Sequence, residues 1–274
     1  MVHHLEKSKM NKVYPLFKVH TDKKLSIKNI ETVLDSGFIN EGEQVKQLTN
    51  QLVPILGSKK LVLTNSGTSA LTLAYKLSGL KPGKNIVSTP MTCIASNTPI
   101  INLGGQIRWA DVDPETGMIT KRTIEAAVDK NTVAVSFVDW AGVTPNLNEI
   151  FDFCKDRKIK LVQDAAHAFM AEYNGQPICN FSDFTCFSFQ AIKHFTCGDG
   201  GALVVSNDEY YAKAKKLKWF GYDRESSKDE LGNWKAQQAE ADIERGEVGY
   251  KFNMNNISAA IGISNIPHIS NLIS

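Results

Sequence analysis

The sequence has no apolar run long enough to span a bilayer, and its first ten residues, MVHHLEKSKM, lack the apolar core of a signal peptide. We therefore expect a cytoplasmic protein with no membrane partner. Neither sign of charge dominates, because 31 basic residues balance 29 acidic ones and leave a net charge of +2. That balance does not mark the chain as a nucleic-acid binder. The basic run at residues 211–218 is typical of the solvated face of a helix.

Cysteine is scarce, and the five cysteines form no C-x-x-C pair. An odd number without paired spacing argues against both a metal site and a disulfide framework. It favours small buried side chains in a reducing compartment, at Cys93, Cys154, Cys179, Cys186 and Cys197. The glycine patterns of nucleotide-binding loops are missing too, because no G-x-G-x-x-G occurs and no G-K-[ST] follows the turn TNSGTSA at 64–70.

The composition is that of an ordinary globular protein, 42% hydrophobic and 22% charged. From residue 61 onward short apolar segments alternate with helix-like ones, which predicts a mostly parallel, doubly wound α/β sheet with helices on both faces. Seven strands are expected, at residues 61–63, 85–88, 106–110, 132–137, 160–163, 184–188 and 202–205. Helices are expected at residues 25–34, 42–56, 70–78, 92–103, 122–128, 147–157 and 208–219. The polar stretch 221–247 is expected to be a surface excursion, and 248–269 returns to helix-like apolar spacing.

The stretch from Leu161 to Gly201 carries the main candidate site. One apolar run ends at Asp164, and a second is followed four residues later by Lys193. Ligands of open α/β sheets bind at the carboxyl ends of strands, so both side chains can face one crevice. Pyridoxal phosphate chemistry needs this pair, because a lysine holds the cofactor aldehyde as a Schiff base and a carboxylate keeps the pyridine nitrogen protonated. The alternative is a solvated surface lysine and a carboxylate that caps a helix or forms a turn.

Small polar residues near two other strand ends suit a phosphate group. Asn65 to Ser69 lies between a strand and a helix start, where backbone N–H groups and hydroxyls can approach a phosphate. An ordinary Ser/Thr N-cap is the alternative there. Ser188 can supply another hydroxyl or simply a strand-end hydrogen bond. His167, three residues after Asp164, can bind the phenolic oxygen of the cofactor or be a structural histidine.

Seven ordered motifs carry a resemblance to a known family: SGFINEG (36–42), TNSGTSAL (64–71), PMTCIASNTPI (90–100), ADVDPETG (110–117), QDAAHA (163–168), FSFQAIKHFTCGDGG (187–201) and GYKFNMNNISAAIG (249–262). From about Leu25 to Gly262 the sequence resembles the nucleotide-sugar aminotransferases of the DegT/StrS type, a branch of the fold-type I pyridoxal phosphate enzymes. The resemblance implies a mostly parallel seven-stranded sheet with helices on both faces, plus an incomplete small domain. The motifs are specific to the family and not to one sugar.

The resemblance implies three roles around the cofactor ring. Lys193 forms the internal aldimine and moves the proton between cofactor and substrate carbons. Asp164 pairs with the pyridinium nitrogen. His167 takes the position that contacts the phenolic oxygen.

The remaining implied residues surround the phosphate and the ring face. Gly67, Thr68 and Ser188 hold the phosphate. Cys93 stands where many relatives have an aromatic residue, so it is expected to contact the ring without stacking on it. Lys251 stands where many relatives have asparagine, and it is expected to reach the phosphate of a neighbouring subunit as a point charge. Its alternative is a solvent-exposed lysine.

The implied reaction transfers an amino group from an amino acid, usually glutamate in this family, to a keto group of a nucleotide-linked deoxysugar. The product is an amino sugar for surface polysaccharide or glycan biosynthesis, and the implied assembly is a homodimer with shared active sites. Dehydratases of the family replace the lysine by histidine, so Lys193 favours transamination, although His194 beside it keeps a dehydratase open. A cysteine desulfurase of the same fold type would need a mobile catalytic cysteine, and none of the five stands in a recognisable loop for it.

Three parts of the chain are expected: an N-terminal arm (1–24), a large cofactor-binding domain (25–247) and the start of a C-terminal small domain (248–274). Relatives usually continue well beyond the AAIG motif, so we expect the small domain to be truncated. Incomplete closure would leave the site wet and the donor poorly oriented. A cofactor-binding relative without turnover is therefore an alternative to a working enzyme.

Overall fold

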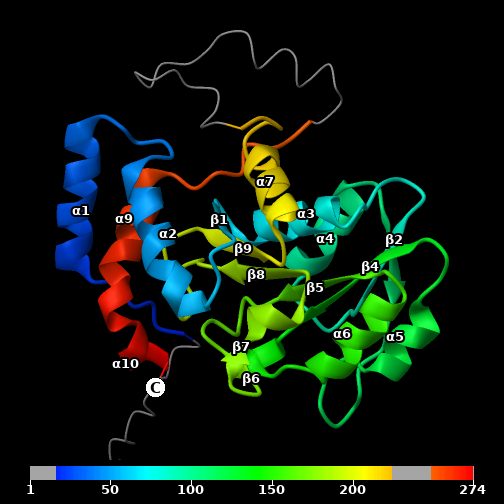
Figure 1. Cartoon of the computed structure of the whole chain (residues 1–274). Helices are drawn as coiled ribbons and strands as arrows, with labels where there is room; N and C mark the ends of the chain where they lie inside the picture. The colour runs from blue at the N-terminus through cyan, green and yellow to red at the C-terminus, as the bar shows by residue number, and fades with distance from the viewer. Residues whose placement is uncertain (1–16, 224–247, 274) are drawn as a thin grey trace, which may run out of the picture.

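The computed structural model describes residues 17–223 and 248–273. Its centre is a seven-stranded sheet with helices on both faces, as Figure 1 shows. The strands are β1 (Leu61–Thr64), β2 (Asn85–Ser88), β3 (Gln106–Trp109), β4 (Thr132–Val138), β5 (Lys160–Asp164), β8 (Phe184–Ser188) and β9 (Gly201–Val205). The predicted seven-stranded sheet is confirmed, and each strand lies within two residues of its expected bounds.

The strands are arranged in the order β1-β9-β8-β5-β4-β2-β3. All neighbours from β8 to β3 are parallel, whereas β9 runs antiparallel to both β8 and β1. The sheet is therefore mostly parallel, as predicted. Its parallel strands all end at one edge, and β4, β5 and β8 are neighbours there, which brings distant parts of the chain together.

In every strand of the sheet except β3, which is largely exposed, residues of the strand face two different hydrophobic layers. Leu61 and Leu63 of β1 point into the larger layer, while Val62 between them points into the smaller one. The larger layer is covered by α2 (Glu43–Leu56), α5 (Lys121–Ala127), α6 (Leu147–Asp156) and α9 (Asn256–Asn265). The smaller layer is covered by α3 (Gly67–Leu77), α4 (Ile94–Asn102) and α7 (Asp208–Leu217). Strands that are buried on both faces explain why short apolar runs predicted the sheet so well.

The two ends of the described chain lie side by side. Helix α1 (Lys23–Ser36) packs on α9, which continues into the short helices η3 (Ile266–His268) and α10 (Ile269–Ile273) (Figure 1). Asp22 caps α1 by accepting a hydrogen bond from the Leu25 N–H at 2.9 Å, so the helix begins at Lys23, two residues before the expected start. The same carboxylate lies 3.0 Å from Nε2 of His268.

The expected helical stretch 248–269 is wrong in its first third. Residues before Asn256 are extended, because Lys251 and Asn253 form β-bridges with Trp219 and Thr64. The Asn65 N–H also donates to the Phe252 carbonyl at 2.8 Å. Tyr250 and Phe252 follow the two-residue alternation of an extended segment, which the helix-like spacing predicted for 248–269 does not separate from α9.

A small hairpin was missing from the sequence expectation. Strands β6 (Glu172–Tyr173) and β7 (Gln176–Pro177) pair around Asn174 and Gly175, whose φ values are 52° and 72°. Asn-Gly is the residue pair that tolerates two successive positive φ angles in a tight hairpin. The short helices η1 (Trp140–Gly142) and η2 (Ile178–Phe181) complete the elements. Most of the predicted polar excursion, residues 224–247, lies outside the described residues. In the described ranges no helix combines the length and hydrophobicity needed to cross a membrane.

Candidate active site

Asp164 ends β5 and is buried, with 5% of its surface exposed. Its Oδ2 accepts a hydrogen bond from Oγ of Ser96 at 2.6 Å, and its Oδ1 accepts one from the Ala166 N–H at 3.1 Å. Burial raises the pKa of this carboxyl, while the two hydrogen bonds and the charge of Lys193 act in the opposite direction. A cation placed against Asp164 would therefore favour its ionised form.

Lys193 lies in the loop between β8 and β9, where its backbone N–H donates to the Gln190 carbonyl at 2.9 Å. The lysine is half-buried, and Phe189 and Phe195 on either side of it are buried. Its positive charge lowers the pKa of both Asp164 and His167. Asp164 ends β5, His167 follows it, and Lys193 follows β8, the neighbouring parallel strand, so the three predicted residues lie at the same edge of the sheet.

His167 is half-buried and is held on two sides by the turn that follows β4. Its Nδ1 accepts a long hydrogen bond, 3.4 Å, from the Ala141 N–H, and the Trp140 ring lies 5.5 Å from its own ring, centroid to centroid. Burial lowers the pKa of His167, and the charges of Lys193 and His194 lower it further. The imidazole is thus neutral near pH 7, with its proton on Nε2 and free to donate.

The predicted phosphate residues form a cradle at the start of α3. Ser66 caps this helix by accepting a hydrogen bond from the Ser69 N–H at 3.1 Å. A Cβ atom at Gly67 would lie 2.9 Å from Cβ of Ser188, and one at Gly201 would lie 2.5 Å from the backbone of Ser66. The two glycines therefore allow the helix start to approach the end of β8 and the start of β9. Thr68 follows with an exposed side chain.

Cys93 is exposed at the N-cap of α4, three residues before Ser96, so it lies on the helix that holds Asp164. The structure gives it no partner that fixes a role, and its contact with a cofactor ring stays a prediction.

Lys251 lies near the cradle of its own chain. Its carbonyl accepts a hydrogen bond from Nδ2 of Asn65 at 3.4 Å, its Nζ donates to Oδ1 of Asn253, and its Nζ is 4.4 Å from the Trp219 ring centroid. Its predicted reach into a neighbouring subunit stays a prediction.

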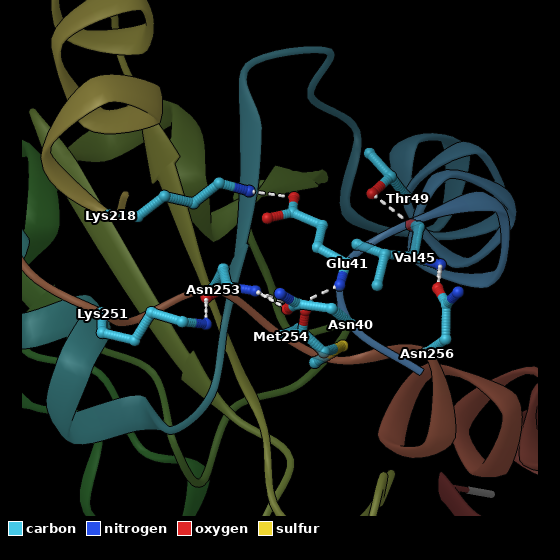
Figure 2. Close-up of polar contacts among 9 residues, drawn as sticks. All are labelled: Asn40, Glu41, Val45, Thr49, Lys218, Lys251, Asn253, Met254 and Asn256. Carbon is cyan, nitrogen blue, oxygen red and sulfur yellow. Dashed lines mark hydrogen bonds and ion pairs between the residues drawn. The ribbon is translucent and has the colours of Figure 1, made fainter. Parts of the chain in front are cut away.

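The segment around Lys251 is anchored on the loop between α1 and α2, as Figure 2 shows. Asn253 donates to Oδ1 of Asn40 at 3.0 Å, and Asn256 accepts from the Val45 N–H at 3.3 Å. Asn256 also donates to the Phe38 carbonyl at 2.8 Å. Two of the motifs, SGFINEG and GYKFNMNNISAAIG, are therefore direct partners.

A buried hydroxyl network beneath Asp164 escaped the sequence analysis. Besides Asp164, Ser96 Oγ contacts Thr92 Oγ1 at 2.7 Å. The Tyr75 hydroxyl donates to the Ser96 carbonyl at 2.8 Å and contacts Oγ of Ser136 at 2.8 Å. Nothing in the sequence pairs Ser96 with a residue 68 positions later, although it does lie inside one of the quoted motifs.

These groups fit a phosphorylated pyridine aldehyde. They offer an amine on a loop, a buried carboxyl that a cationic ring nitrogen would keep ionised, and a helix N-terminus opened by Gly67. On a mostly parallel sheet of this order, they match the arrangement expected in the fold-type I architecture of pyridoxal phosphate enzymes.

Comparison with known proteins agrees. The profile of the DegT/DnrJ/EryC1/StrS aminotransferase family matches residues 20–274. The spore coat polysaccharide biosynthesis protein SpsC of Bacillus subtilis is 31% identical over 254 residues, which cover 91% of this chain and 63% of SpsC. The crystal structure of AtS13 from Actinomadura melliaura superimposes with a TM-score of 0.84 at 31% identity, over 96% of this chain and 69% of that one. The sugar aminotransferase CalS13 from Micromonospora echinospora gives a TM-score of 0.83 at 30% identity, over 94% and 69%.

The chain belongs to the DegT/DnrJ/EryC1/StrS aminotransferase family. The resemblance stated from the motifs is confirmed, and so is the fold-type I architecture. The chain spans 63% of the length of SpsC, which is less than two thirds of that relative.

Proposed function

We propose that this protein transfers an amino group from an amino acid, with glutamate as the first donor to test, to a keto group of a nucleotide-linked deoxysugar. The proposal is supported by three features at one edge of the sheet. Asp164 ends β5, Lys193 follows the neighbouring strand β8, and Gly67 at the start of α3 lies against Ser188 at the end of β8. Relatives that are named for sugar transamination and for polysaccharide biosynthesis support a sugar substrate and a product used in surface polysaccharide or glycan synthesis.

Pyridoxal phosphate, when bound, supplies an aldehyde that condenses with amines and a ring that accepts an electron pair. Lys193 would hold that aldehyde through Nζ and, once displaced by a substrate amine, carry a proton to and from the substrate carbon. Lys193 is half-buried, which limits the water around its side chain. Asp164 would accept a hydrogen bond from the protonated ring nitrogen.

His167 would donate from Nε2 to the phenolic oxygen, since its Nδ1 already accepts from Ala141. The N–H groups at the start of α3, together with Thr68 and Ser188, would bind the phosphate at the positive end of the helix. Gly67 keeps that space open. Cys93 would touch one face of the ring, and Lys251 would add a charge to the phosphate site of a second subunit in a dimer.

Transamination is favoured over sugar dehydration by one observation. Lys193, and not the neighbouring His194, is the residue whose charge acts on Asp164. His194 is exposed, and its charge lowers the pKa of His167. Of these two residues, Lys193 is the one whose charge favours the ionised carboxyl that the chemistry requires.

The first test replaces Lys193 with alanine. The parent chain mixed with pyridoxal phosphate should show visible absorbance that borohydride fixes as one covalent adduct per chain, because the amine bonds to the aldehyde. Lys193→Ala should lose the adduct entirely, whereas Lys59→Ala, which removes an exposed lysine, should keep it. A full adduct on Lys193→Ala would show that another lysine is the attachment site.

The second test measures turnover. Glutamate added to the loaded chain should bleach the absorbance and release 2-oxoglutarate, and a panel of keto-sugar nucleotides should restore it. Absorbance that no amino donor changes would identify a binder without turnover. Elimination of water from the sugar, with no amino group transferred to the product, would identify a dehydratase, and His194→Ala should then abolish it.

A further inference from the structure

Two buried side chains next to the candidate site share a hydrogen bond and leave two oxygens unexplained. Asp139 follows β4, Gln163 lies in β5, and neither has any exposed surface. Nε2 of Gln163 donates to Oδ2 of Asp139 at 2.9 Å. Oδ1 of Asp139 and Oε1 of Gln163 are buried and accept no hydrogen bond. Two orphaned acceptors on two bonded side chains are unusual, because buried polar atoms are nearly always paired.

The charges around Asp139 do not favour a carboxylate. None of the ion pairs between described residues includes Asp139, and the charge that acts on it most directly is that of Asp164, one strand away and of the same sign. The Asp139 N–H donates to the Asp164 carbonyl at 3.0 Å, so the two residues are direct neighbours. A buried carboxylate without a cation is costly and usually takes up a proton instead.

We infer that Asp139 is a neutral carboxylic acid that donates from Oδ1 to Oε1 of Gln163, so that the acid and the amide share two hydrogen bonds. A proton on Oδ1 makes that oxygen a hydrogen-bond donor and gives Oε1 of Gln163 a bond to accept, so both oxygens then have a partner. Burial and the charge of Asp164 both raise the pKa of Asp139 well above its usual range, which agrees with this assignment.

The pair positions the candidate site without touching it. It joins the carboxyl ends of β4 and β5, where Asp164 ends one strand and the turn beginning at Trp140 follows the other. The N–H of Ala141 in that turn binds His167. A neutral Asp139 also leaves Asp164 as the only negative charge of the two, which is what pairing with a ring cation requires. Asp139 is therefore a positioning residue whose protonation state matters to its neighbour.

Urea unfolding as a function of pH tests the proton directly. An aspartate that keeps its proton when folded and loses it when unfolded stabilises the fold most at low pH, and that stabilisation falls as pH rises toward the folded pKa. Asp139→Asn cannot titrate and keeps both hydrogen bonds, with its amide N–H donating to Gln163. The ratio of the parent's unfolding constant to that of Asp139→Asn should therefore rise about tenfold per pH unit between pH 5.5 and 7.5. A ratio that stays flat over this range would show that Asp139 is ionised in the fold and would overturn the inference.

Asp139→Leu is the matched control, because it also lacks a titrating group but breaks both hydrogen bonds. Its unfolding constant should exceed that of Asp139→Asn by a factor that does not change with pH. A pH-dependent factor would mean that the effect comes from packing around residue 139 and not from its proton. Asp152→Asn, which removes an exposed carboxyl from α6, corrects for the loss of one surface charge.

Infrared spectroscopy keeps the inference testable if a variant fails to fold. The parent chain at pH 7, labelled with ¹³C-aspartate, should show the carbonyl band of a protonated carboxylic acid. Asp139→Asn should lose this band, whereas Asp164→Asn should retain it. Absence of the band from the parent chain, or its loss only in Asp164→Asn, would contradict the assignment to Asp139.

Discussion

At the scale of single residues, the candidate site depends on how readily the buried carboxyl of Asp164 ionises. Asp164 is nearly inaccessible to water, and its burial raises its pKa. Ser96 opposes that effect with a 2.6 Å hydrogen bond to one of its oxygens. A hydrogen bond to a charged acceptor is worth about 1.5–3 kcal/mol, more than one to a neutral carboxyl, so this bond favours the ionised form of Asp164. Ser96 thus sets how readily Asp164 serves a cationic ligand.

Ser96→Ala should therefore weaken pyridoxal phosphate binding by raising the pKa of Asp164 further. The loss should be larger at pH 6 than at pH 8.5, because a higher pKa leaves more of the carboxyl protonated at the lower pH. Absorbance titrations of the parent and the variant across this range give the two dissociation constants.

The control is Thr98→Ala on the same helix. Thr98 is exposed, and its hydroxyl bonds the Ile94 carbonyl within α4, so its loss should change stability by less than about 0.5 kcal/mol and leave cofactor affinity intact. Equal losses in both variants would mean that α4, and not the Ser96 hydroxyl, supports the site.

At the scale of elements, the sequence predicted the strands that are buried on both faces of the sheet. The strands inside the sheet are short apolar runs that end at polar residues, so their bounds could be read closely. The extended stretch before Asn256 could not, because its pairing partners, Thr64 and Trp219, are far away in the sequence. The Asn174–Gly175 hairpin could have been found from its turn pair alone.

Helix α3 starts earlier than its apolar pattern suggested, at Gly67 and not Ala70. Its first turn is small and polar because it lies against β8 and β9. The contact distances show that Gly67 has no room for a side chain: a Cβ atom would come within 2.9 Å of Cβ and 3.2 Å of Cα of Ser188. Overpacking of this kind typically costs about 1–3 kcal/mol.

Gly67→Ala should accordingly lower the free energy of unfolding by about 1–3 kcal/mol. It should also weaken binding of pyridoxal phosphate more than binding of pyridoxal, because the α3 N-terminus is displaced from the phosphate. Denaturant titration and binding assays with both ligands measure the two effects. In Gly67→Ala/Ser188→Gly, which removes the facing Cβ, much of the lost stability should return. Thr68→Ala, at the next and exposed position, should change stability by less than about 0.5 kcal/mol. Unchanged stability in Gly67→Ala would show that the helix start can move away from β8.

At the scale of the whole molecule, α9 connects the helices α1 and α2 to the loop that carries Lys193. It packs on α1 and α2, and Asn256 at its start holds the loop between them (Figures 1 and 2). Its Gly262 lies against Cys197, four residues after Lys193. The site therefore rests on contacts between residues that lie far apart in the sequence.

These long-range contacts set the limit of what the sequence could predict about the site. Lys193, Asp164 and Gly67 could be predicted as candidates because each has a type and a position that cofactor chemistry requires. Ser96 and Asp139 were not, since a serine inside a helix and an aspartate after a strand have many ordinary roles. Their significance comes from partners that only the folded chain supplies.

Gly262 shows how closely the terminal helices and the site are packed. Alanine is favoured over glycine in a helix by about 1 kcal/mol, which alone would stabilise the fold. Here, however, a Cβ atom would lie 2.6 Å from Sγ of Cys197 and 3.0 Å from Cδ2 of Leu48, both of which are fully buried. An overpacking cost of about 1–3 kcal/mol should outweigh the gain in propensity.

Gly262→Ala should therefore destabilise the protein. It should also weaken pyridoxal phosphate binding, because Cys197 and Lys193 lie in the same loop. The hydrogen bond from the Cys197 N–H to the Phe189 carbonyl joins the ends of that loop. Adding Cys197→Ala removes the closest clashing atom, so the double variant should recover both properties relative to Gly262→Ala. Cys197→Ala alone should be destabilising, as a buried side chain is truncated. Denaturation and cofactor titration of the four proteins give a double-mutant cycle, in which a coupling free energy near zero would show that α9 does not press on the Lys193 loop.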